Sequence, residues 1–340
     1  MMIGRHFLTI TITEVARRAG VSIKTVSRVV NQQPHVREVL REKVIAVMDA
    51  LDYSPNIAAR RLASNQAFTI GLLFGGAPGE YFPQIIISIL SFGTQKGYTL
   101  LVSNFIPFNP ASRAYINDLV RKKAVDGLIL TPPCDNDRVF LRQLKASAIP
   151  FVRISPADTS SPLPYVAADD YRGAYEISEY LIGLGHRSIG FIYGEPTHNA
   201  SRERFEGFRA ALRAYRIRYR SEWTRRADFC FELGVQAGRE LLQLDPRPTA
   251  IFASDDEEAV GVLVAAHQLG IKVPEELSVV GFDDFPSARK AYPALTTVRQ
   301  PMDEISQLAT QLLLDLIKKR KPEMRHIRVK TSLVLRDSTK

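Results

Sequence analysis

The chain has 340 residues, of which 45% are apolar and 24% charged, an ordinary balance for a folded protein with room for two or three domains. The net charge of +9 is uneven, because residues 1–65 hold ten Lys and Arg against five Asp and Glu. The sequence has two cysteines, Cys134 and Cys230, which are too few for a disulfide framework. It has no cluster of metal-ligating residues, which argues against a metal or cofactor. It has neither an apolar run of transmembrane length nor a signal peptide, which argues against a membrane partner. We therefore expect a protein of the reducing cytoplasm with a basic N-terminal segment suited to phosphates.

Two short helices are expected in that basic segment. Residues 11–14 have the T-x-x-E form of a capping box, and Gly20 supplies a turn after the first helix. Ser22 is a natural N-cap for a second helix, in which Val26, Val29 and Val30 share one face. The opposite face carries polar and basic side chains beside one apolar residue: Ile23, Lys24, Ser27 and Arg28. This pattern predicts a helix-turn-helix that reads DNA.

A third amphipathic helix over residues 36–51 is expected to complete an all-α head. Pro55 then ends the helical pattern, since proline cannot donate a backbone hydrogen bond. Residues 56–63 favour helix but span only about two turns, so we expect them to order only on DNA or against a second copy. We assign residues 1–55 to a DNA-binding domain and residues 56–65 to a hinge helix and linker.

Residues 66–340 alternate between apolar strands and helices, which predicts an α/β core of two doubly wound parallel-sheet lobes. Strands are expected at Phe68–Phe74, Tyr98–Asn104, Gly127–Thr131, Phe151–Ser155, Tyr165–Ala168, Ile189–Tyr193, Ala250–Ser254, Ser278–Phe282, Leu295–Arg299 and residues 327–336. Helices are expected at Phe82–Lys96, Tyr171–Leu184, Arg202–Ala214, Asp256–Leu269 and Met302–Lys319. A Pro- and Ser-rich break at residues 156–164 suggests the lobe boundary. We expect lobe 1 at about 66–160 plus 295–325, and lobe 2 at about 165–292 plus 326–340.

The run TITEVARRAGVSIKTVSRVVN (residues 11–31) resembles the DNA-binding head of the lactose/galactose repressor family of bacterial transcriptional regulators. The similarity continues through Tyr53-Ser54-Pro55-Asn56 at that family's hinge. It extends over the core in segments such as DGLIL (126–130), LGHRSIGFI (184–192), VPEELSVVGFD (273–283) and PALTTV (293–298). The resemblance implies a periplasmic-binding-protein-like core and a DNA-binding repressor, with operator DNA, a small-molecule effector and a second copy of the chain as partners.

For DNA contact, the recognition helix should place Ile23, Lys24 and Arg28 at base edges. Phosphate contacts are expected from Ser22, Thr25, Ser27 and Asn31. The resemblance also implies a hinge helix with Asn56 as its N-cap, Leu62 wedged into the minor groove, and Ala59 allowing two hinges to approach closely. We expect a dimer on a near-palindromic operator.

For effector contact, the resemblance implies a cleft between the lobes lined by Tyr81, Phe82, Arg153, Ser155, His198, Arg204, Phe229 and Asp256. Tyr81 and Phe82 would offer an aromatic platform, or would simply fill the core. Arg204 would hold hydroxyls or a carboxylate, or would pair with a neighbouring glutamate on its helix. Asp256 would bind the effector, or would only cap its helix. Many family members carry an aspartate where this chain has Ser155, so the effector cannot be copied from relatives.

The sequence leaves two effector classes open and weighs against two other classes of protein. A carbohydrate effector is favoured because most of the family responds to sugars, and a purine or nucleoside is the alternative because the Tyr81-Phe82 pair resembles purine-responsive members. A sugar-acting enzyme on a Rossmann-like core is disfavoured, since the sequence has neither G-x-G-x-x-G after a strand nor a Walker A loop, G-x-S-x-G or H-E-x-x-H. A transport-binding protein would need no basic head. The direction of control, release from DNA or promotion of binding, is open.

Overall fold

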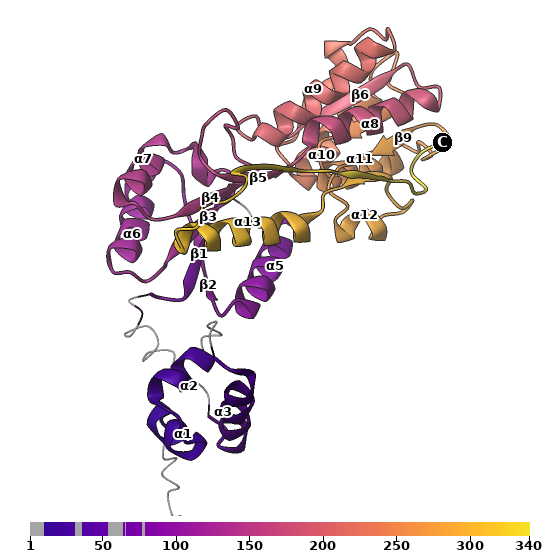
Figure 1. Ribbon diagram of the computed structural model, residues 1–340. Helices are drawn as coiled ribbons and strands as arrows, with labels where there is room; N and C mark the ends of the chain where they lie inside the picture. Colours follow the sequence, from indigo (N-terminus) through magenta and orange to yellow (C-terminus); the bar gives the residue numbers. More distant parts are fainter. Residues whose placement is uncertain (1–9, 31–35, 54–63, 65, 77–78) are drawn as a thin grey trace, which may run out of the picture. The chain divides into compact units, whose positions relative to one another are not determined.

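The computed structural model describes residues 10–30, 36–53, 64, 66–76 and 79–340. Two compact units separate after Ala67, a helical head and an α/β core that begins at Phe68 (Figure 1). Within the described residues, no helix is both long enough and apolar enough to cross a lipid bilayer. The described part of the chain thus has the expected organisation of a helical head followed by parallel-sheet lobes.

The head contains the helix-turn-helix and a third helix, namely α1 (Ile12–Ala19), α2 (Ile23–Val30) and α3 (Glu38–Ala50). Thr11 Oγ1 accepts a 3.4 Å hydrogen bond from Glu14 N, and Gly20 ends α1 in the left-handed region at φ 63°. Ser22 Oγ accepts from Thr25 N at 3.1 Å, so it caps α2 as expected. The three helices bury one small apolar core: Val15, Ala16, Ala19, Val26, Val29 and Val44.

The first lobe is built on a six-stranded parallel sheet of order β11-β5-β4-β3-β1-β2. Its strands are β1 (Thr69–Phe74), β2 (Thr99–Asn104), β3 (Gly127–Leu130), β4 (Phe151–Ile154), β5 (Tyr165–Ala168) and β11 (His326–Val329). Its helices are α5 (Tyr81–Gln95), α6 (Pro110–Arg121), α7 (Arg138–Ser147) and α13 (Met302–Ile317), with a 3-10 turn η1 (Cys134–Asn136).

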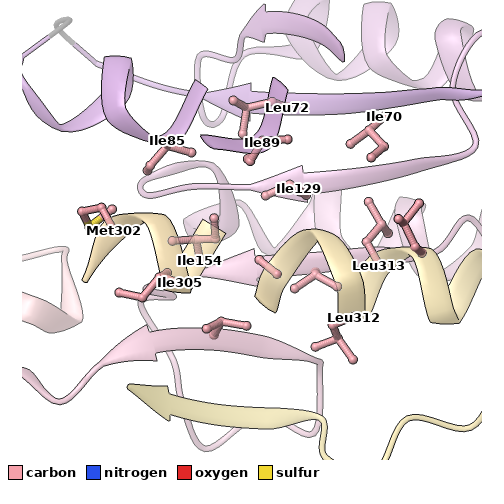
Figure 2. Close-up of a cluster of buried hydrophobic side chains, with 14 of the residues drawn as sticks. Ile70, Leu72, Ile85, Ile89, Ile129, Ile154, Met302, Ile305, Leu312 and Leu313 are labelled. Carbon is pink, nitrogen blue, oxygen red and sulfur yellow. The ribbon is translucent and has the colours of Figure 1, made fainter. Parts of the chain in front are cut away.

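Both faces of this sheet are covered, as its apolar strands require. On one face α5 and α13 pack side by side although they lie over 200 residues apart in sequence (Figures 1 and 2). Figure 2 shows Ile85 and Ile89 of α5 and Leu313 of α13 against Leu72 and Ile129 of the sheet. The other face carries the second apolar cluster, which includes residues of α6 and α7.

The second lobe repeats the plan with a four-stranded parallel sheet of order β7-β6-β8-β9. Its strands are β6 (Ile189–Tyr193), β7 (Thr224–Arg226), β8 (Ala250–Ala253) and β9 (Ser278–Val280). Its helices are α8 (Asp170–Gly183), α9 (Asn199–Ala214), α10 (Phe231–Leu242), α11 (Asp256–Gln268) and α12 (Pro286–Lys290), with a 3-10 turn η2 (Ser221–Trp223). A ribbon of β10 (Thr297–Arg299) and antiparallel β12 (Ser332–Val334) borders β9 through a bridge between Val280 and Thr296.

The lobe boundaries differ from those expected from the sequence. We expected the chain to leave the first lobe at residues 156–164, but β5 still pairs with β4 of the first sheet. We also expected residues 295–325 in lobe 1 and 326–340 in lobe 2, but β10 lies beside β9 while β11 pairs with β5. The chain therefore crosses between lobes near residues 169, 300 and 330. Strand-to-strand pairing determines these crossings, and the Pro-Ser segment is a loop inside the first lobe.

Candidate functional site

A cavity of about 1170 Å³ lies where the loops after the strands of the two lobes meet. Parallel strands of one sheet end at the same edge, so the loops that follow them converge there. The first lobe contributes loops after β1, β2, β3 and β4, and the second contributes loops after β6, β7, β8 and β9. Seven of the eight residues expected to contact an effector line this cavity: Tyr81, Phe82, Arg153, Ser155, His198, Arg204 and Phe229.

Aromatic rings enter the cavity wall from both lobes. Tyr81 and Phe82 begin α5 and meet edge to face, with ring centroids 5.4 Å apart at 79°. In the second lobe, the ring centroids of Phe229 and His198 lie 5.7 Å apart. Burial lowers the pKa of His198, which favours the neutral ring near pH 7. The wall therefore offers apolar ring faces rather than only charged groups.

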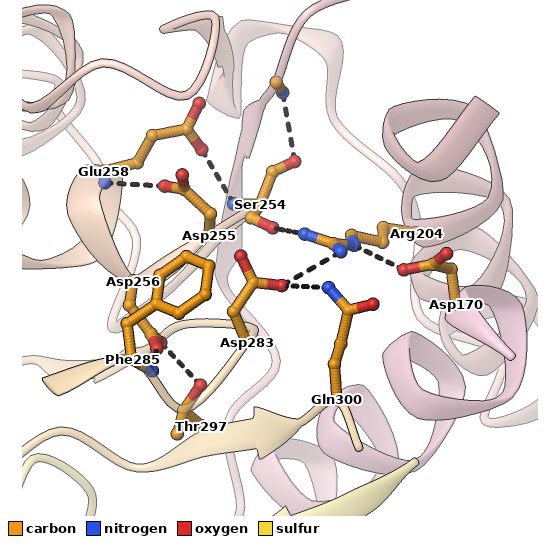
Figure 3. A network of polar contacts seen from close by, with 11 residues as sticks. Asp170, Arg204, Ser254, Asp255, Asp256, Glu258, Asp283, Phe285, Thr297 and Gln300 are labelled. Atoms are coloured by element: carbon orange, nitrogen blue, oxygen red, sulfur yellow. Dashed lines mark hydrogen bonds and ion pairs between the residues drawn. The ribbon is translucent and has the colours of Figure 1, made fainter. Parts of the chain in front are cut away.

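Hydrogen bonds from backbone N–H groups to side-chain carboxylates hold Phe229 in place. It adopts a left-handed backbone with φ 60°, and its N–H donates to Glu258 Oε1 at 2.8 Å. The other carboxylate oxygen of Glu258 accepts from Ser254 N at 2.9 Å, and Glu258 N donates to Asp255 Oδ1 at 2.8 Å (Figure 3). Gly194, directly after β6, leaves the room for the ring, since a Cβ at that position would lie 2.2 Å from a Phe229 ring carbon.

Arg204 projects from α9 into the centre of a polar network (Figure 3). Its Nε donates to Asp170 at 2.8 Å, its Nη2 donates to Asp283 at 3.0 Å, and its Nη1 donates to the carbonyl of Ser254. The guanidinium carbon also lies 3.8 Å from the Phe282 ring centroid. The alternative of a surface pair with a neighbouring glutamate on the helix is wrong, because Arg204 is only 3% exposed and pairs with Asp170 and Asp283.

The network around Arg204 is rich in buried carboxylates: Asp170, Asp255, Asp256, Glu258 and Asp283. Burial raises the pKa of each of them, and for Asp283 the pKa rises to about 6, although Arg204 opposes the rise. Burial alone would lower the pKa of Arg204, but Asp283 and Asp170 raise it. Gln300 donates a further hydrogen bond to Asp283. Among the described residues, no group of His, Cys, Asp and Glu side chains is arranged to hold a metal ion.

Asp256 does not lie at the cavity, which corrects the expectation from the family pattern. It is fully buried behind the wall, where one carboxylate oxygen accepts from Phe285 N at 2.7 Å and the other from Thr297 Oγ1 at 2.5 Å. It does not cap α11 either, since the N-cap is Asp255. Asp255 lines the cavity, and so does Asp283.

Arg153 lines the cavity, but its guanidinium is mainly used to hold a loop. Its Nη1 and Nη2 donate to the carbonyls of Asp158 and Leu163 at 2.9 and 3.0 Å, and Asp135 lies 3.5 Å away. Arg153 is 1% exposed, and burial lowers its pKa. It therefore anchors the Pro-Ser loop after β4, next to Ser155.

The sequence did not single out four residues that the structure places in this site. Asp283, Asp255 and Gln300 follow β9, β8 and β10 within three residues, so their positions after strands could have identified them. Asp135 follows β3 in η1, and its carboxylate accepts from Ala157 N at 3.0 Å. Its contact with the Pro-Ser loop depends on tertiary structure and has no local sequence signal.

In the head, the residues expected at base edges face outward. Ile23 is 48% exposed, which is unusual for a large apolar side chain, and Lys24 and Arg28 are also exposed. Ser22 is exposed, while Thr25 and Ser27 are half-buried. The remaining residues expected to contact DNA lie outside the described residues: Asn31, Asn56, Ala59 and Leu62.

Comparison with known proteins matches both units. Residues 11–56 match the family of bacterial regulatory proteins, lacI family, and residues 178–339 match the periplasmic binding protein-like domain. The chain is 36% identical to the HTH-type transcriptional repressor PurR of Klebsiella pneumoniae (strain 342) over 329 residues, 96% of each chain. Among solved structures, a lac repressor dimer bound to operator and the anti-inducer ONPF is 30% identical with TM-score 0.77, and a transcriptional regulator CelR-cellobiose complex is 28% identical with TM-score 0.75. In both cases the match covers 97% of this chain and 99% of the other.

Proposed function

Because this chain belongs to the lacI family of bacterial regulatory proteins and is a DNA-binding transcriptional repressor rather than an enzyme, we propose that the cavity of its core holds the small molecule that controls operator binding. The family match is the observation that carries the DNA-binding function. The proposal for the cavity rests on its ring faces from both lobes and its fixed polar groups, a combination typical of small-molecule sites.

For operator recognition, we assign base contacts to Ile23, Lys24 and Arg28, which are exposed on α2. Arginine can donate two hydrogen bonds to guanine, lysine can donate to the same edge, and isoleucine can contact a thymine methyl. Ser22, Thr25, Ser27 and Asn31 are assigned to phosphates. The hinge residues keep the roles that the family pattern implies: Asn56 as N-cap, Ala59 at the close approach of two hinges, and Leu62 in the minor groove.

For the assembly, we propose a homodimer. The first lobe has exposed apolar side chains on α5 and on β2, an edge strand: Ile87, Leu90 and Val102, which are 67%, 47% and 41% exposed. In the second lobe, Tyr292 is 98% exposed. Exposed apolar groups on both lobes suit a self-complementary contact along the core. The similar lac repressor structure is a dimer on operator.

For the effector, we propose a planar purine base, with its ring between the aromatic groups of the two lobes, Tyr81 with Phe82 and Phe229. Arg204 and Asp283 would then meet donors and acceptors at the ring edge, where a fixed guanidinium and carboxylate are selective. Similarity to repressors named PurR along almost the whole chain supports this choice over the carbohydrate that the sequence alone favoured. A carbohydrate is the second candidate, because the similar CelR structure holds cellobiose and because Arg204 and Asp283 also suit vicinal hydroxyls.

Isothermal titration calorimetry of the full chain distinguishes these candidates. We expect adenine, guanine or hypoxanthine to bind with one site per chain, and cellobiose and ribose not to bind. Phe229→Ala should weaken binding of the base by about 1–3 kcal/mol through lost stacking. The matched control is Tyr215→Ala, an exposed aromatic residue at the end of α9 in the same lobe. Binding of a sugar but of no purine base would reverse the assignment of the effector.

A further inference from the structure

Two sets of polar contacts join the two lobes, and the first of them lies at the cavity. After β1 of the first lobe, Glu80 Oε2 accepts from the N–H and hydroxyl of Ser287 on α12, at 3.1 and 2.6 Å. The backbone N–H of Glu80 donates to Glu257 Oε1 on α11 at 3.2 Å. Near the segments where the chain crosses between the lobes, Arg328 of β11 forms a bidentate ion pair with Glu203 of α9, with N–O distances of 2.7 and 2.8 Å.

The Glu80 contacts lie away from two of the three segments that connect the lobes. Two of the three connections leave the first sheet from β5 and β11 at one edge, and β1 lies three strand positions from β5; the third runs from β10 into α13, which packs against α5. At about 4.8 Å per strand, that places β1 roughly 14 Å from β5. A hinge movement about the connecting edge therefore separates Glu80 from Ser287 more than it separates Arg328 from Glu203.

Glu80 is also the chain neighbour of the aromatic wall. It is the N-cap residue of α5, and Tyr81 and Phe82 follow it immediately. Glu80 and Glu257 themselves line the cavity. Any separation of Glu80 from the second lobe would move the start of α5 and hence the two rings.

We propose that Glu80 and Ser287 form a latch that holds the two lobes closed over the cavity, so that this chain populates the closed core without an effector and binds its effector more tightly as a result. A ligand binds with an apparent affinity that scales with the population of the competent state. Hydrogen bonds to a charged acceptor stabilise a folded arrangement more than neutral ones do. Only the affinity part of this inference rests on the proposed function.

The test measures the distance between the lobes in the full chain by pulsed electron spin resonance, with no small molecule added. Spin labels are placed at Ala114→Cys on α6 and Ala214→Cys on α9, both exposed, in a Cys230→Ser background. Cys134 is buried and stays unlabelled. We expect Glu80→Ala and Ser287→Ala to add a population at longer distance. Glu80→Gln, which keeps an acceptor oxygen but loses the charge, should add less of this population than Glu80→Ala.

The control is Glu176→Ala, which removes a carboxylate paired with Arg172 inside α8 and so inside one lobe. It should leave the distances unchanged. Equal distance distributions for Glu80→Ala, Glu176→Ala and the parent, at equal melting temperatures, would overturn the latch. If calorimetry detects a purine base, Glu80→Ala should weaken its binding by about tenfold or more. Longer distances without binding of any base would support the latch and refute only the effector assignment.

Discussion

At the scale of single residues, Asp256 does not take the cavity position that the family pattern suggests, and another aspartate that follows a strand, Asp283, lies there. Asp283 faces the cavity and pairs with Arg204. Asp256 is buried behind the wall and accepts hydrogen bonds from Phe285 N and Thr297 Oγ1. The residue types alone could not separate them, because both follow apolar strands and both are carboxylates. Their roles depend on which hydrogen-bond donors the fold brings near each of them.

Asp256→Asn tests the structural role. Burial, and then Asp283, raise the pKa of Asp256 well above its ordinary value, so the folded state holds this proton more tightly than the unfolded state does. The stability contributed by Asp256 should therefore increase as the pH falls from 8 toward about 4, the ordinary pKa of an aspartate. Asparagine keeps the shape but removes the charge and one acceptor oxygen, so the stability of the variant relative to the parent should be higher at pH 8 than at pH 5.

Urea unfolding at the two pH values measures this difference. An asparagine variant that is less stable than the parent by the same amount at pH 8 and pH 5 would mean that the charge of Asp256 is not the source of the pH dependence. Calorimetry on the same variant should give effector binding like that of the parent, because Asp256 does not line the cavity.

At the scale of elements, the site depends on close packing between a strand end and a loop. Gly194 follows β6 and faces the Phe229 ring, which the loop before α10 places in the cavity wall. Phe229 and its neighbour Asp228 both have positive φ, at 60° and 55°. This loop is held by Glu258 rather than by regular secondary structure.

Gly194→Ala should displace the Phe229 ring, because the new Cβ would lie within 2.2 Å of it. We expect binding of the effector to weaken by about 1–3 kcal/mol, similar to the loss in Phe229→Ala. The control is Gly183→Ala in α8, where an added Cβ meets no atom within 4 Å. Titration calorimetry on both variants gives the comparison, and equal affinities in the two would show that the ring has room to move.

The strands and helices with strong periodicity were predictable from the sequence, since continuous apolar runs such as β1 and β3 need cover on both faces. The edge strand β7, with the sequence Thr-Arg-Arg, has no apolar signal and owes its conformation to pairing with β6. The lobe boundaries were wrong for the same reason, because strand order is decided by contacts between distant segments. In the site, positions after strands were predictable, while the loop partners of Arg153 were not.

At the scale of the whole molecule, the chain joins a DNA reader to a core whose two lobes together line a cavity. The head exposes Ile23, Lys24 and Arg28, and the core fixes Arg204 between two carboxylates in the wall of the cavity. A ligand that favours one arrangement of the lobes shifts the population of that arrangement. Control of operator binding requires only that the two arrangements differ in affinity for DNA.

The most direct test is a fluorescence anisotropy titration of the full chain on a DNA duplex that the protein selects from a random pool. It is performed with and without adenine, guanine or hypoxanthine. We expect two chains per duplex and a change in operator affinity of about fivefold or more when the base is present. Arg28→Ala should lose about 1–3 kcal/mol on the selected duplex but little on random DNA, with unchanged affinity for the base. An operator affinity that stays the same with and without a base that binds the core would contradict control through the cavity.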